Sequence, residues 1–232
     1  MKLQLLLLIF LIPSVSSAEY RIKLAAENSW PPYSNEAGEG ISKDKIQRAF
    51  DSVGVDVEFI VVPYARALFL AQSGKVDGAF NVTKQKSTLD KFDFGKVPIV
   101  QVKASFYYQK ESSLNFNTVD EIPAGTSIAL IRDYEYGEPY ENSKHKFNEV
   151  RVSSQKQIIK LLQLKRVDMA IMFDDVAEYY LSELKLNKNE IKKGHINHTS
   201  DIFVAFNKHK KLSEVILLLD EGLKQTHISY SD

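Results

Sequence analysis

Short apolar stretches with two different periods alternate along the chain. Alternation, which places every second side chain on one face of a strand, occurs at 21–26 and 55–61, and 76–80 is a third strand candidate. Apolar residues three or four positions apart, the spacing of one helix face, occur between them at 46–53 and 65–72. The order strand, helix, strand, helix, strand predicts a largely parallel sheet covered by helices.

A second series with the same order follows. Strands are expected at 127–131, 150–152 and 168–173, and helices at 139–144, 155–165 and 176–186. Two extended apolar segments, 97–108 and 202–206, are expected to cross between the units, and a final helix over 212–223 to pack against the first. Two α/β units joined by two crossings predict a hinged molecule of two lobes. Its cleft is expected where the carboxyl ends of the strands face one another.

Particular residues mark the expected helix ends. Ser42 is the expected cap of the first helix, and Gly54 its end. Asp174 or Asp175 is a candidate cap for a helix that begins at Val176. The serine and the aspartates carry oxygens that can accept from the free amides of a first helical turn.

The N-terminus has the composition of an export signal. Lys2 provides a positive start, 3–12 is apolar apart from Gln4, and Ser16 and Ala18 occupy the −3 and −1 positions of a signal-peptidase site. The apolar run is shorter than the roughly 20 residues that span a bilayer. We therefore expect residues 1–18 to be a cleaved signal peptide.

Removal of that peptide would leave 232 − 18 = 214 residues, enough for two lobes of about 100 residues each. We expect the first lobe to comprise 19–101 and 203–232, and the second lobe 102–202. The chain has no cysteine, so neither disulfides nor a lipoprotein anchor are expected. These features predict a soluble, monomeric periplasmic protein.

Charge and motifs argue against several other classes. The formal net charge is 0, whereas proteins that bind nucleic acid usually carry a basic excess. The sequence has no glycine-rich phosphate loop and no Gly-x-Ser-x-Gly elbow. His195 and His198 have a metal-like spacing without a clear third ligand. We expect no cofactor, no metal and no enzymatic activity.

The chain resembles the type 2 periplasmic solute-binding proteins, specifically the family 3 group that serves polar amino-acid ABC importers. The resemblance covers nearly all of the chain after the signal peptide, and the order and spacing of its motifs are more specific than any single motif. They are SWPPY at 29–33, VPYARAL at 62–68, SGKVDGAF at 73–80, FDF at 92–94 and KRVDMAI at 165–171.

The resemblance implies ligand contacts in the first lobe. Trp30 and Tyr64 match positions where the family stacks aromatic rings on a ligand, and Tyr33 lies beside them. Glu27 can accept hydrogen bonds from a bound amine. Arg66 carries a planar guanidinium group that can bind a carboxylate. Core packing for the rings, and solvent exposure for the charges, are the structural alternatives.

Further contacts are implied after the third strand and in the second lobe. The family's ligand-binding loop corresponds to 80–83, where Thr83 is the expected contact and Asn81 the second choice. Arg132 and Tyr134 follow a strand end where the family presents donors to a carboxylate. Asp174 matches the carboxylate that holds an α-amino group, unless it only caps its helix.

One position departs from the family pattern. The family usually places an arginine after the loop threonine to bind the ligand's α-carboxylate. That position falls near Thr88 or Leu89, and neither side chain can do this. Lys84 and Lys86 are nearby cations without the bidentate guanidinium group. A small carboxylate, an amine or a modified amino acid therefore remains open as the ligand.

These features predict a periplasmic protein that captures a small polar solute in its cleft and delivers it to an ABC permease in the inner membrane. Two alternatives stay open. One is an enzyme like cyclohexadienyl dehydratases, which share the fold and use cleft carboxylates. The other is a ligand-reporting partner of a membrane sensor.

Overall fold

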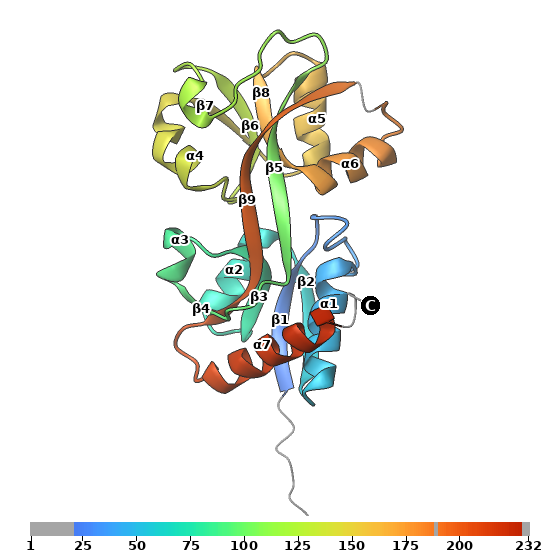
Figure 1. The fold of residues 1–232 in the computed structure, drawn as a ribbon, viewed down its shortest axis with the longest axis vertical. Coiled ribbons are helices and arrows are strands. Elements are labelled where there is room, and N and C mark those ends of the chain that lie inside the picture. Colours follow the sequence, from blue (N-terminus) through green and yellow to red (C-terminus); the bar gives the residue numbers. More distant parts are fainter. Residues whose placement is uncertain (1–20, 188–189, 229–232) are drawn as a thin grey trace, which may run out of the picture.

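The molecule consists of two lobes joined by two long strands (Figure 1). The structure is a computed structural model that describes residues 21–187 and 190–228. The expected signal peptide lies outside the described residues. In the part of the chain that is described, no helix combines the length and apolar character needed to cross a membrane.

The first lobe is built from three parallel strands, the helices between them, a short additional strand and the last helix of the chain. Its elements are β1 (Arg21–Glu27), α1 (Ile41–Ser52), β2 (Asp56–Val62), α2 (Tyr64–Gln72), β3 (Gly78–Thr83), α3 (Lys86–Leu89), β4 (Phe92–Phe94) and α7 (Ser213–Ile228).

The second lobe repeats this plan. Its elements are β6 (Ser127–Ile131), α4 (Glu138–Ser143), β7 (Asn148–Val152), α5 (Gln155–Gln163), β8 (Met169–Phe173) and α6 (Asp174–Glu183), with short 3-10 turns at Val119–Glu121 and Lys144–Lys146. The expected order of strands and helices is thus observed in both halves.

The two crossings unite the lobes into one sheet. β5 (Val100–Gln109) and β9 (Ile191–Asn207) run antiparallel to each other between the lobes. The strand order is β2-β1-β3-β9-β5-β8-β6-β7, with β4 paired to β9. Strands are parallel within β2-β1-β3 and β8-β6-β7, and antiparallel where β9 meets β3 and β5 meets β8.

The crossing strands are irregular near their middle. Their pairing shifts register between Ala104 and Ser105 and again before Tyr107. Such bulges bend a strand and interrupt its hydrogen-bond ladder. The irregular pairing lies on the strands that connect the lobes, where a two-lobe protein needs its hinge. The lobe boundaries at 101/102 and 202/203 remain a prediction.

Ser42 is not the cap of the first helix, as the sequence suggested. The helix begins at Ile41, and Ser42 is buried in its first turn. The amides of Ile41 and Ser42 donate to the carbonyls of Pro32 and Tyr33, so the preceding turn replaces a side-chain cap. Gly40 permits this close approach, because a Cβ there would lie 2.5 Å from the Tyr33 carbonyl oxygen.

The aspartates at the start of α6 are likewise not caps. The helix begins at Asp174, after Phe173 in an extended conformation. Both Asp174 and Asp175 lie in the first turn, where a negative charge is favourable beside the helix N-terminus. Their side chains are therefore available for contacts outside the helix.

Asp220 holds the last helix to the segment that leads into β5. Its carboxylate, which is 6% exposed, accepts from the amides of Lys96 and Val97 at 2.8–2.9 Å. We expect Asp220→Asn to lower the free energy of unfolding by about 2–3 kcal/mol, because an amide nitrogen cannot accept these bonds. Urea unfolding measures this. Glu221→Gln, on the exposed side of α7, should change it by less than about 0.5 kcal/mol. Equal effects would exclude the anchoring role.

Candidate functional site

A small buried chamber lies between the lobes, at the carboxyl ends of β1, β3, β6 and β8. Nine residues line it: Glu27, Trp30, Tyr64, Asn81, Thr83, Tyr134, Glu135, Phe173 and Ile202. Its volume of about 10 Å³ admits roughly one water molecule. The lobes are therefore closed around a polar seam that has no room for a solute until they separate.

Glu27 is the deepest charged group of the chamber. It is the last residue of β1 and only 2% exposed. The Tyr134 hydroxyl, from the second lobe, donates to its carboxylate. Burial raises the pKa of Glu27 to about 8, while the Tyr134 hydrogen bond opposes the shift and the charge of Glu135 adds to it. At neutral pH the closed form thus favours a protonated Glu27.

Glu135 approaches from the opposite side. Its carboxylate accepts from the Tyr64 hydroxyl at 3.0 Å and from the Thr83 hydroxyl at 3.2 Å, both in the first lobe. Burial raises the pKa of Glu135 to about 7, although these two hydrogen bonds lower it. Two carboxyl groups from different lobes therefore face one cavity and resist ionisation while the lobes are closed.

Aromatic rings form the walls between these carboxyl groups. Trp30 meets Phe173 edge to face at a centroid distance of 5.2 Å, and Tyr64 meets Tyr134 in the same way at 5.2 Å. Each pair joins one lobe to the other. Aromatic faces beside carboxylates are the surroundings that organic cations prefer.

Asn81 occupies an unusual backbone position on the chamber wall. The pairing of β3 with β9 shifts register between Phe80 and Val82, and Asn81 between them has a positive φ of 65°. Asparagine is among the few residues that tolerate this conformation. Its amide nitrogen and oxygen are both buried and have no hydrogen-bond partner among the described residues. The bulge therefore directs an unsatisfied amide at the seam.

Arg151 supports the turn that carries Tyr134 and Glu135. Its guanidinium group donates to the carbonyls of Ile131 and Tyr134 at 3.1 and 3.2 Å. The buried Tyr136 hydroxyl accepts from the Ile131 amide at 2.7 Å. These bonds satisfy backbone groups that the turn leaves free, and they fix the two chamber residues in position.

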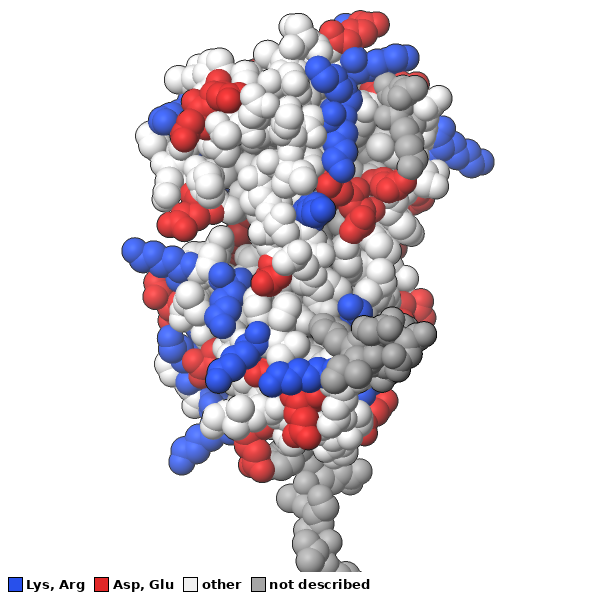
Figure 2. Space-filling model, in the orientation of Figure 1, with Lys and Arg blue, Asp and Glu red and all other residues white. Residues whose placement is uncertain are grey.

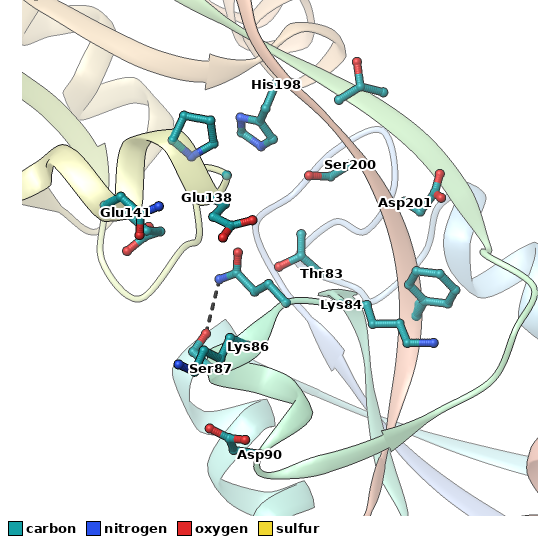
Figure 3. Close-up of a pocket in the computed structure, with 16 residues that line it drawn as sticks. Thr83, Lys84, Lys86, Ser87, Asp90, Glu138, Glu141, His198, Ser200 and Asp201 are labelled. Carbon is teal, nitrogen blue, oxygen red and sulfur yellow. Dashed lines mark hydrogen bonds between the residues drawn. The ribbon is translucent and has the colours of Figure 1, made fainter. Parts of the chain in front are cut away.

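A larger groove opens beside the chamber and meets it at Thr83. It has a volume of about 880 Å³, within the range of ligand sites, and runs between α3 of the first lobe and α4 of the second. Glu138 and His198 extend into it from one side, and Lys84 and Lys86 line the other (Figure 3). The buried chamber holds the more specific arrangement, so we interpret the groove as its entrance.

The rim of this groove carries charges of both signs. Figure 2 shows a notch between the lobes, with acidic side chains above it and basic side chains below. His198 is uncharged at neutral pH, because burial lowers its pKa to about 4. Among the residues that the structure describes, no group of three or more His, Asp or Glu side chains is arranged to hold a metal ion.

Six of the ten residues predicted from the sequence line the chamber: Glu27, Trp30, Tyr64, Asn81, Thr83 and Tyr134. Tyr33 lies outside the lining, and its hydroxyl donates to Asp175 across the seam. The roles of all ten in binding remain predictions.

Three charged residues on that list also lie elsewhere. Arg66 is exposed and stacks on Phe69 at 5.1 Å. Arg132 is exposed. Asp174 accepts from Tyr107 at 3.0 Å and pairs with Lys193 at 2.7 Å. The structure therefore brings Glu27 together with three of the four aromatic candidates, and it leaves Asp174 and the two predicted arginines outside the chamber.

Sequence reasoning missed Glu135, Phe173 and Ile202. Glu135 directly follows Tyr134, which the family resemblance singled out, and this adjacency was the available signal. Only the turn at the end of β6 shows that Glu135 points to the seam.

The structure shows the surroundings of Thr88 and Leu89, where the family usually has its arginine. The Thr88 hydroxyl donates to the Thr83 carbonyl at 2.7 Å, and Leu89 is 42% exposed. Lys84 donates to the Gly95 carbonyl at 3.3 Å and lines the outer groove with Lys86. No Lys, Arg or His is among the described residues that line the chamber. The chamber is acidic and offers no positive charge to a carboxylate.

Comparisons with known proteins agree with this architecture. Residues 22–225 match the family described as bacterial extracellular solute-binding proteins, family 3. A histidine kinase sensor domain with similarity to periplasmic binding proteins has a TM-score of 0.76 and 17% identity, covering 91% of this chain and 92% of that one. No curated protein matches the chain.

Two ligand-bound proteins share the fold as well. An ancestral arginine-binding protein bound to arginine has a TM-score of 0.74 and 17% identity, covering 90% and 92% of the two chains. An amino acid ABC transporter substrate-binding protein from Streptococcus pneumoniae, bound to L-arginine, has a TM-score of 0.72 and 19% identity over 90% of each chain. The expected two-lobe α/β fold is confirmed, and the chain belongs to the bacterial extracellular solute-binding proteins of family 3.

Proposed function

We propose that this protein captures a small cationic solute, a basic amino acid or a related amine, by closing its lobes around it. One observation carries the proposal: the buried carboxyl group of Glu27 and the half-buried one of Glu135 come from different lobes and line one chamber, which has aromatic walls and no basic side chain among its described residues. A cation inside it would be paired with carboxylates, whereas an anion would be unpaired.

Closure follows from the same contacts. In the closed form Glu135 accepts from Tyr64 and Thr83, and Glu27 accepts from Tyr134. A bound cation replaces these neutral donors with a charged one, and charge-assisted hydrogen bonds are roughly twice as strong. The solute therefore stabilises the closed form, which holds it, relative to the open form. Ligand-driven closure requires this difference.

The similar proteins support a cationic ligand. Two of them are described as bound to arginine, whose guanidinium group presents several donors in one plane. By analogy with the amino acid ABC transporter protein, this chain would work as a periplasmic monomer that passes its solute to an importer in the inner membrane. Similarity to a kinase sensor domain supports a second candidate, in which the closed form signals to a membrane sensor.

Agmatine, L-arginine and L-glutamate distinguish the proposal from an ordinary amino-acid site. Agmatine is arginine without its carboxylate. Because the described residues that line the chamber include no basic group, we expect agmatine to bind at least as tightly as arginine, and glutamate not to bind. Calorimetry on the purified protein measures the affinities. Glutamate binding more tightly than agmatine would contradict the proposal.

The same protein tests the enzymatic alternative, which the raised pKa of both carboxyl groups favours because protonated carboxyls can act as general acids. Incubation with prephenate or arogenate, followed by mass spectrometry, should find both compounds unchanged. Loss of water from either compound would favour the dehydratase-like enzyme.

A further inference from the structure

We infer that the solute's buried portion carries, beside its cation, an uncharged group that both donates and accepts hydrogen bonds, a carboxamide being the best complement. This inference rests on the proposed function and deepens it. It is carried by the polar atoms of Asn81 and Trp30, which line the chamber and have no partner among the described residues.

A group that both donates and accepts hydrogen bonds would complement the Asn81 amide. Its amide nitrogen is a donor and its oxygen an acceptor, and both are buried and unsatisfied in the closed form. Burying such groups without partners costs about 1–3 kcal/mol each. The bulge and the left-handed backbone hold the amide in this position, so it is not a side chain free to turn to solvent. Strained, unsatisfied groups of this kind cluster at ligand contacts.

Trp30 adds a second donor. Its ring is 2% exposed and packs edge to face on Phe173, while its indole nitrogen is buried without a partner. Buried indole N–H groups usually find an acceptor. Glu27 and Glu135 accept from hydroxyl groups in this chamber, and the unpaired Asn81 oxygen accepts no hydrogen bond from the indole among the described residues. The indole therefore needs an acceptor that the solute brings.

The charge of the chamber selects the kind of acceptor. A carboxylate would satisfy the two donors but would place a third acidic group in a cavity that two carboxyl groups already line. It would also leave the Asn81 oxygen without a donor. A carboxamide is neutral, matches a carboxylate in shape, and can form a reciprocal pair with the Asn81 amide. A single water molecule, for which the chamber has room, is the competing occupant.

Three isosteric probes test this directly. The probes 4-aminobutanamide, 4-aminobutanoate and 4-methylpentylamine share one ammonium group and one chain length, and differ only in a carboxamide, a carboxylate or an apolar end. We expect calorimetry at about pH 8.5, where both glutamates are largely ionised when the solute is bound, to rank the carboxamide first. Its advantage over each of the others should be about tenfold or more. The 3-aminopropanamide set repeats the test with a shorter spacer.

Two substitutions assign the effect to these side chains. Asn81→Gly keeps the left-handed backbone and removes the amide, so the carboxamide advantage should disappear. Trp30→Phe keeps an aromatic ring and removes the N–H, so the advantage should fall about threefold or more. Asn115→Gly and Tyr179→Phe, at exposed positions, are matched controls and should leave it unchanged.

The outcomes separate this inference from the function on which it rests. Binding of all three probes with equal affinity, or preference for the carboxylate, overturns the inference and indicates that water fills the polar sites. In the equal-affinity case the cation proposal stands. Failure of every amine to bind overturns the proposed function and the inference together. If Asn81→Gly does not fold, the order of probe affinities measured with the unchanged protein and with Trp30→Phe decides whether the inference holds.

Discussion

Replacing Glu27 with glutamine is expected to weaken agmatine binding by about 3 kcal/mol, more than 100-fold. The bound cation would lose a buried counter-charge, and a neutral amide that keeps the same size cannot replace it. Glu135→Gln should act in the same direction. Calorimetry or a fluorescence titration with agmatine measures the change.

The stability of the ligand-free protein should behave differently. Glu27 is buried with its pKa raised to about 8, so the closed form already holds it as a neutral group near pH 7. Glutamine should therefore leave the thermal unfolding temperature unchanged or higher. Glu39→Gln, an exposed change in the same lobe, should affect neither property. Undiminished agmatine affinity in both Glu27→Gln and Glu135→Gln would show that the chamber carboxylates do not bind the cation.

The second large effect is a pH-dependent opening of the ligand-free lobes. In the open form, solvent returns the pKa of both carboxyl groups towards 4.5, whereas in the closed form they lie at about 8 and about 7. The closed form binds more protons than the open form. Its free-energy advantage over the open form is therefore complete below about pH 4.5 and is lost as pH rises through 7 to 8. The change amounts to several kcal/mol, on the order of one per pKa unit.

Small-angle scattering can follow this equilibrium. The radius of gyration without solute should be smaller near about pH 5 and increase towards about pH 9. Agmatine should reverse the increase, and its affinity should rise over the same interval because binding favours ionised carboxylates and releases protons. The double variant Glu27→Gln, Glu135→Gln should show a flat profile. An unchanged pH response in that variant would assign the opening to other groups.

Much of the fold follows from local patterns in the chain. The alternating apolar residues at 21–26, the apolar segment at 127–131 and the helical spacing in the segments after them predicted the two α/β units and their crossings. The family motifs added the order of the pieces. Helix ends were less predictable: at Ser42 the correct residue type was present, but carbonyls nine residues earlier satisfied the free amides instead.

The sequence by itself therefore determined the two-lobe architecture and named most of the aromatic and acidic residues that line the seam. Only the tertiary structure decided which of those charges meet. Arg66 and Glu135 both follow strand ends, yet one is exposed and the other is enclosed by Tyr64 and Thr83. The physical reason is that periodicity is a property of neighbours along the chain, whereas burial and the resulting pKa depend on residues that approach from the other lobe.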